Sequence, residues 1–296
     1  MKKIKFVLVL LCIILLSGCS LFEYSCPEGE ELVGDECLSC PDGYIMNKEE
    51  KSCTMSEEKK KSSISEFFNS ATDTTYKTDV KKIEEDKYEL TVYYTRDNIY
   101  LHIFTADVLT FVKEMIGKTD DMNTLIDKVH FIASEKEEIK YYVDLNEYKD
   151  LTEENVESKL IIMDKDKNVI NKTVSQIQKD YISEYKKNCK TYDYKTIFRY
   201  AEDYKGKEVK FTGKVVQVIE SDTMPSYRIN VTKDKWGYYD DTIYVSFFDM
   251  DGNTPRILED DIVTVYGTLS GTYTYETVLG ASVTIPSMLA LYIDIK

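Results

Sequence analysis

The chain has only two histidines, one tryptophan and five prolines among its 296 residues. Its single continuous apolar run, residues 6–16, is shorter than the about 18 to 20 residues that span a bilayer, which excludes a polytopic membrane protein. No block of basic residues marks a nucleic-acid-binding tail. With 43% apolar and 31% charged residues, the composition excludes a mainly disordered or fibrous chain, and the length predicts about two domains.

The sequence also lacks the usual catalytic sets: a Ser/His/Asp arrangement, a phosphate-binding glycine loop and a metal cluster. His102 and His130 have no partner at motif spacing, so we interpret both as ordinary strand residues, with a metal or acid–base site as the alternative. Asp164, Asp166 and Asn168 lack the glycine and the final glutamate of a calcium loop and predict a hairpin turn. We therefore expect no enzymatic activity, no metal and no cofactor.

The N-terminus has the three parts of an export signal, namely Lys2, Lys3 and Lys5, the apolar run, and small residues before Cys19. Residues 16–19 read Leu-Ser-Gly-Cys and resemble the lipobox of bacterial lipoproteins. The resemblance implies a signal peptide over residues 1–18, acylation of Cys19 with palmitate, and anchoring on the extracytoplasmic face of the cell membrane. An ordinary secretory signal or an uncleaved anchor is the alternative.

The net charge of the chain indicates which kinds of partner it can bind. Cleavage before Cys19 would leave 35 basic and 53 acidic residues and a net charge of −18. A surface this acidic repels phosphate backbones, which disfavours nucleic acid as a partner.

Four cysteines, Cys26, Cys37, Cys40 and Cys53, fall in an internal repeat that begins Cys-Pro-Glu-Gly and then Cys-Pro-Asp-Gly. Segments this short cannot bury a sufficient core, and disulfides persist in exported chains. We favour pairing within each repeat, Cys26 with Cys37 and Cys40 with Cys53. Crossed pairing, a zinc site and reduced thiols are the alternatives. This module is assigned to residues 19–54.

Residues 55–84 are polar and highly charged, and predict a linker with one helical turn at most. Residues 85–188 predict a small α+β domain. Its expected parts are an antiparallel hairpin over 88–92 and 99–103, a helix from Thr105 to Gly117, strands at 129–133, 139–145 and 159–163, and a helix bearing Val174, Ile177, Tyr181 and Tyr185. Cys189 is interpreted as a buried thiol or an unpaired reactive one.

Residues 190–296 predict a small β-barrel. Between residues 206 and 218 the apolar positions switch from odd to even beside Gly213, as in a bulged, sharply bent strand. Four further strands, at 227–232, 242–248, 262–269 and 283–295, fit the meander of an OB-fold. Asp249, Asp251 and Asn253 lack the calcium-loop glycine and indicate a tight acidic turn.

The stretches 206–218, 257–267 and 272–286 also resemble the OB-fold domain of exported or membrane-anchored proteins of low-GC Gram-positive bacteria. They are similar to the C-terminal domain of the clostridial toxin-regulator family, which implies self-association and DNA binding. The lipobox departs from that family, because it would place this domain outside the cell.

OB-folds bind ligands on the face of their second and third strands. The residues expected there are aromatic or cationic: Tyr227, Arg228, Trp236, Tyr244, Tyr273 and Tyr275. They suit sugars or single strands, or are ordinary half-exposed strand residues. From residue 190 onward the chain has 12 basic and 16 acidic residues, which argues against tight binding of nucleic acid. The sequence thus predicts a lipid-anchored, extracytoplasmic binding or assembly protein that contacts an envelope protein or glycan. A membrane-anchored regulatory module that binds single-stranded nucleic acid is the alternative.

Overall fold

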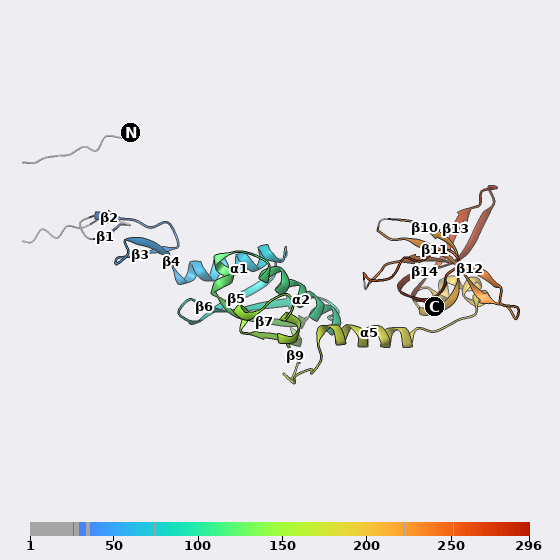
Figure 1. Ribbon diagram of the computed structural model, residues 1–296, viewed down its shortest axis with the longest axis horizontal. Coiled ribbons are helices and arrows are strands. Elements are labelled where there is room, and N and C mark those ends of the chain that lie inside the picture. Colours follow the sequence, from blue (N-terminus) through green and yellow to red (C-terminus); the bar gives the residue numbers. More distant parts are fainter. Residues whose placement is uncertain (1–25, 27–29, 34–35, 74, 222, 251) are drawn as a thin grey trace, which may run out of the picture.

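The computed structural model describes residues 26, 30–33, 36–73, 75–221, 223–250 and 252–296. Along the chain it has two small hairpins, a five-stranded sheet with helices, and a closed five-stranded barrel (Figure 1). The expected signal peptide and Cys19 lie outside the described residues. In the part of the chain that is described, no helix is long and apolar enough to cross a membrane.

The cysteine module consists of two antiparallel hairpins. One pairs β1 (Glu31–Val33) with β2 (Glu36–Leu38), and the other pairs β3 (Tyr44–Asn47) with β4 (Ser52–Met55). Disulfides join Cys26 to Cys37 and Cys40 to Cys53. The predicted pairing within each repeat is therefore confirmed, and the crossed pairing and the zinc site are wrong.

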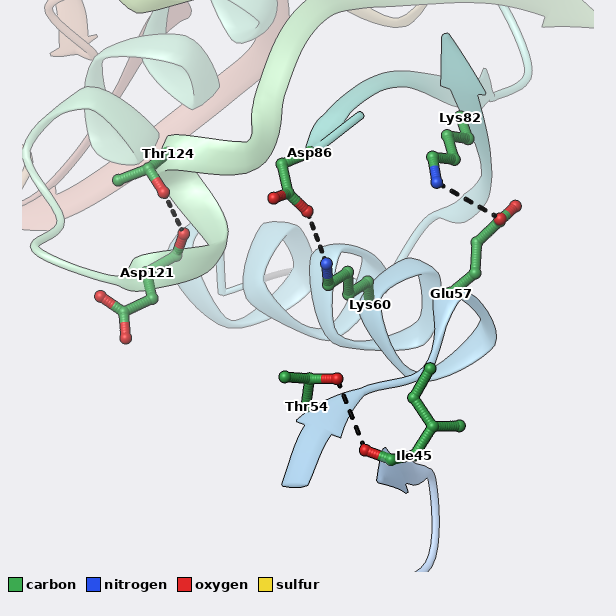
Figure 2. Close-up of polar contacts among 8 residues, drawn as sticks. All are labelled: Ile45, Thr54, Glu57, Lys60, Lys82, Asp86, Asp121 and Thr124. Carbon is green, nitrogen blue, oxygen red and sulfur yellow. Dashed lines mark hydrogen bonds and ion pairs between the residues drawn. The ribbon is translucent and has the colours of Figure 1, made fainter. Parts of the chain in front are cut away.

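The predicted linker over residues 55–84 is wrong, because these residues belong to the folded core that follows. Helix α1 (Glu57–Ala71) is capped by Ser56 and buries an apolar face that includes Phe68. The first turns of α1 are tied to the hairpin of β5 (Lys77–Glu84) and β6 (Lys87–Thr95) by the ion pairs Glu57–Lys82 and Lys60–Asp86 (Figure 2). Glu57 and Lys60 lie on the same side of the helix as Phe68, about two to three turns before it, so the charge that suggested a solvated tether instead docks the first turns of α1 onto the sheet.

The sheet has the strand order β5-β6-β7-β8-β9, with β7 (Ile126–Glu135), β8 (Glu138–Asn146) and β9 (Ile161–Asp164). Strands β6 and β7 are parallel and are joined through α2 (Leu101–Ile116) and α3 (Asp121–Leu125). The short η1 (Tyr148–Asp150) and α4 (Val156–Lys159) precede β9. One core, from Ile64 to Ile177, unites these elements, so the predicted boundary at residue 85 is also wrong.

The predicted hairpin over 88–92 and 99–103 is wrong in its second half. Residues 101–103 begin α2, and β6 pairs instead with β5 and β7. Thr105 is not the N-cap, because its hydroxyl lies inside the helix and donates to the carbonyl of Leu101 at 2.9 Å. His102 therefore lies in a helix and not in the predicted strand, whereas His130 lies in β7 as predicted.

Helix α5 (Val174–Asn188) connects the sheet to the barrel (Figure 1). It starts at a capping box on Thr173, and its first turns bury Val174 and Ile177 in the core of the sheet. Near its end, Tyr185 and the thiol of Cys189 pack against Tyr292 of the barrel. Cys189 is 2% exposed, which confirms a buried thiol.

The barrel is preceded by α6 (Tyr194–Arg199) and α7 (Ala201–Tyr204). Its strands are β10 (Glu208–Ile219), β11 (Ser226–Lys233), β12 (Tyr239–Phe247), β13 (Ile262–Glu276) and β14 (Ser282–Ile295). They close in the order β10-β11-β12-β14-β13, a five-stranded barrel of the OB-fold type. The register of β10 shifts between Val215 and Gln217, so the predicted bulged strand is confirmed.

Two glycines allow the barrel to close tightly. A Cβ at Gly213 would meet the carbonyl oxygen of Asn230, and one at Gly267 would meet that of Leu289. Close approach of two backbones is a common reason for glycine within a strand.

Candidate binding surface of the barrel

The barrel brings four of the predicted ligand residues together on its outer side: Arg228, Tyr244, Tyr273 and Tyr275. Arg228 of β11 and Tyr244 of β12 are direct cross-strand partners. Neighbouring positions on both strands, such as Ile229 and Val245, are buried in the barrel core. Because side chains alternate along a strand, Arg228 and Tyr244 face outward. We call these four residues the tyrosine surface.

The four side chains form a continuous series of ring contacts. Tyr244 and Tyr273 stack with centroids 3.9 Å apart and 16° between the ring planes. The Tyr273 and Tyr275 centroids are 6.3 Å apart, at 21°. The guanidinium carbon of Arg228 lies 3.5 Å from the centroid of Tyr275. The series therefore runs from Tyr244 through Tyr273 and Tyr275 to the guanidinium of Arg228.

Tyr273 and Tyr275 lie on a part of the β13–β14 hairpin that we call the arm, residues 271–287. The register of β13 against β14 shifts between Leu269 and Gly271, and Gly271 has φ of 97°, a conformation that side chains disfavour. Residues two apart on a strand share a face, so both tyrosines point the same way. The hairpin thus carries aromatic rings over the face of β11 and β12.

Arg228 is held by its ring contact more than by hydrogen bonds. Its Nε atom is buried and has no hydrogen-bond partner among the described residues. Guanidinium groups stack on aromatic faces while keeping their outer N–H groups available as donors. The surface can therefore offer a ligand exposed ring area and a fixed cation.

Two predicted site residues lie elsewhere. Tyr227 is 5% exposed and belongs to the barrel core, so its placement on the ligand face is wrong. The reason is strand alternation, since its neighbour Arg228 takes the outward position. Trp236 is 75% exposed in the turn between β11 and β12, where Lys235 lies 5.0 Å from its ring. Lys233, where β11 ends, lies five residues beyond Arg228, about 17 Å at the usual rise, so Trp236 does not join the surface.

Sequence reasoning missed two aromatic residues beside the surface. Tyr194 and Phe198 of α6 have ring centroids 5.8 Å apart, and Phe198 is 40% exposed. The pKa of Tyr194 is raised, first by burial and then by Asp241, Asp240 and Tyr275, and Phe198 lines a hollow together with Thr272 of the arm. Their spacing of four residues on a short helix was the available signal.

The other polar candidates have structural partners. His130 Nδ1 lies 2.8 Å from Asp144 Oδ1, and its Nε2 lies 3.5 Å from Glu89 Oε2. The ring of His102 stacks on Tyr181 at 3.5 Å. Asp164 Oδ1 accepts from the N–H groups of Asp166 and Asn168, which confirms the predicted turn. Among the residues that the structure describes, no three His, Cys, Asp or Glu side chains are arranged to hold a metal ion.

No protein-family model matches the chain, and no curated protein matches it. Solved structures similar to it include the mitochondrial single-stranded DNA-binding protein Rim1 of S. cerevisiae (16% identity; 30% of this chain and 94% of that one; TM-score 0.22). Others are a small single-stranded DNA-binding protein of Streptomyces coelicolor (18%; 31% and 94%; 0.25) and an OBody bound to hen egg-white lysozyme (17%; 36% and 94%; 0.23). At these identities and TM-scores, nothing about the ligand of this chain follows from them.

Proposed function

We propose that this chain is a lipid-anchored, extracytoplasmic binding protein without catalytic activity, and that its barrel holds an envelope glycan on the tyrosine surface. The observation that carries the proposal is the series of ring contacts from Tyr244 to Arg228 on the outer face of β11 and β12. OB-folds bind oligosaccharides and oligonucleotides on this face.

The charge balance favours a neutral ligand over a polyanion. From residue 190 onward there are 12 basic and 16 acidic residues, and the charges of Asp241 and Asp240 help to raise the pKa of Tyr194 on α6. This acidic field would repel a polyanion, whereas it would not affect the binding of an uncharged sugar ring. Stacking on tyrosine depends on ring area and is indifferent to this field.

The location rests on two independent features. The lipobox-like residues 16–19 follow a basic and then an apolar segment. The disulfides Cys26–Cys37 and Cys40–Cys53 support a chain that folds outside the reducing cytoplasm. Together they favour export with the barrel held away from the membrane by the disulfide-linked hairpins and the sheet.

The test is a titration of the detergent-extracted full chain with soluble glycan strands from bacterial cell wall, followed by NMR of the backbone amides. We expect shifts at β11, β12 and the arm in the wild type, and weaker binding in Tyr244→Ala and Tyr273→Ala. Trp236→Ala is the matched control, since it removes an exposed aromatic ring outside the surface and should bind like the wild type. If all three variants bound the glycan as tightly as the wild type, the tyrosine surface would not be the glycan site.

Single-stranded nucleic acid is a second candidate, because a guanidinium beside stacked rings is also how bases are held. Its signature is an affinity that falls steeply as salt rises. A titration with a thymidine oligonucleotide at low and high salt separates the two candidates. Tight, salt-dependent binding would favour nucleic acid, and a flat titration at low salt would eliminate it.

A further inference from the structure

A separate cavity lies in the barrel between the β10–β11 loop, the end of β12 and the segment that leads into β13. Its volume is about 270 Å³, slightly below the ~300 Å³ at which sites for drug-sized molecules begin. Two aromatic rings line it, Tyr227 and Phe247, with centroids 6.4 Å apart and exposures of 5% and 4%. Val218 and Ile257 add apolar wall, so the cavity has room for one small molecule with an apolar body.

The hydroxyl of Tyr227 has no hydrogen bond to a described residue among the causes that raise its pKa, which are burial first and then the charges of Glu220 and Asp249. This oxygen is not one of the fully shielded polar atoms without a partner, so solvent reaches it and its hydrogen-bond partner comes from outside the described residues. Because Tyr227 lines the cavity, a molecule inside it can supply that partner. A phenol hydroxyl both donates and accepts, so this group alone does not fix the ligand's chemistry.

The charges around the cavity determine the chemistry of the ligand. Arg256 Nη2 lies 2.7 Å from Glu220 Oε1, and this exposed ion pair at the rim is neutral as a unit. Asp249 accepts from the N–H and the hydroxyl of Thr254 at 3.0 and 2.9 Å, and no cation pairs with it among the described residues. One carboxylate charge therefore remains unbalanced next to two aromatic rings, a combination that attracts cations and rejects anions.

We propose that this cavity binds a small organic cation, with its apolar body against Tyr227 and Phe247 and its charged nitrogen toward Asp249. The site shares no residue with the tyrosine surface, so it is independent of the proposed glycan site. The cation can be a free or headgroup ammonium such as choline, or a lysine side chain of a partner, and the test includes both.

The test is NMR titration of the full chain with choline, with 3,3-dimethylbutan-1-ol, which has the same shape but no charge, and with Nα-acetyl-lysine amide. We expect a cation to shift the amide signals of Phe247 and Ile257, and the neutral alcohol to leave them unchanged. A stronger effect of choline identifies a free or headgroup ammonium, and a stronger effect of the lysine compound identifies a protein partner.

Three variants make the result specific. Asp249→Asn keeps an oxygen for Thr254 but removes the charge, and should weaken cation binding at least about tenfold. Tyr227→Phe keeps the ring and should weaken it by about threefold to tenfold. Asp260→Asn removes the same charge from an exposed pair with Lys214 outside the cavity and should change nothing. Equal shifts by choline and the alcohol, no shifts by either cation, or wild-type affinity in a folded Asp249→Asn would overturn the proposal.

Discussion

The ring of Tyr244 on β12 stacks on the ring of Tyr273 on the arm, with centroids 3.9 Å apart. Strand β14 lies between β12 and β13 in the barrel, so this contact crosses over a strand. It holds the arm against the outer face of the barrel and fixes the direction in which Tyr275 meets Arg228. The tyrosine surface is thus assembled from two parts of the barrel that this stack brings together.

The stack should be measurable as a coupling free energy. In a double-mutant cycle of Tyr244→Ala and Tyr273→Ala, we expect an interaction of about 0.5–1.5 kcal/mol in the free energy of unfolding. Tyr244→Phe keeps the ring and should retain most of it. Additive effects of the two alanine substitutions would show that the arm is not held by this contact.

The pKa values of the two histidines should lie on opposite sides of the pKa of an ordinary histidine. The hydrogen bond and charge of Asp144, with Glu89 adding its charge, raise the pKa of His130 against the effect of burial. Burial lowers the pKa of His102. Since the chain has only two histidines, their ring signals in NMR can be assigned with one variant, His130→Gln. If the pKa values of both histidines fell on the same side of ~6.5, the result would contradict the structure.

These shifts predict how stability depends on pH. The contribution of His130 is complete below its unfolded pKa of ~6.5 and is lost as pH rises through its higher folded pKa. We therefore expect His130→Gln or Asp144→Asn to lower the free energy of unfolding in mildly acidic solution, and to lower it less at alkaline pH. The contribution of His102 has the opposite sign, because it is present above ~6.5 and is lost as pH falls. Denaturant unfolding across this range is the measurement, and a cost of His130→Gln that does not vary with pH would contradict it.

Helix α1 should behave as part of the sheet's core. Phe68 is completely buried and touches Phe111 and Phe131 of that core at centroid distances of 6.2 Å. Phe68→Ala should lower the free energy of unfolding by about 3–5 kcal/mol, from lost burial and the cavity that remains. Glu66→Ala on the exposed side of the same helix should stay within about 0.5 kcal/mol. A similar, small effect of both changes would restore the linker interpretation.

The disulfides should stabilise the hairpins separately. Each closes a short loop, with sequence separations of 11 and 13, and a loop closure of this size contributes about 2–4 kcal/mol. Replacing Cys40 and Cys53 by serine should speed hydrogen exchange in β3 and β4 and leave the barrel unchanged. The matching change at Cys26 and Cys37 is the control, since it should leave β3 and β4 largely protected. Equal exchange after either change would mean that the two hairpins unfold as one unit.

The sequence predicted the elements whose apolar period is regular. The disulfide pairing, the five barrel strands and helix α5 follow from repeats and alternation that tertiary contacts reinforce. The bulge in β10 was visible because Gly213 and the switch in parity coincide. At the candidate site, Arg228, Tyr244, Tyr273 and Tyr275 could be selected as aromatic or cationic positions on strands. Their stacking could not be predicted, because it depends on where the arm bends at Gly271.

The errors have physical causes as well. Charged residues such as Glu57 and Lys60 concealed α1, because they lie on the same side of the helix as Phe68 and form ion pairs with the sheet instead of facing solvent. Apolar residues alternate over 99–103 as they do in a strand, but from residue 101 they belong to the helical period of α2. The parallel pairing of β6 with β7 requires that helix as a crossover. Tyr227 was misplaced by a single position, and in a strand one position is the difference between the surface and the core.

The most direct test of the account is the affinity of the wild-type chain and of the Tyr244→Ala/Tyr273→Ala variant for soluble cell-wall glycan strands, measured side by side by calorimetry. We expect binding by the wild type that changes little with salt, and a loss of at least about tenfold in the variant, because each stacking ring contributes about 1 kcal/mol. Unchanged affinity in a variant that remains folded, or no binding by the wild type, would contradict the assignment of the tyrosine surface as the ligand site.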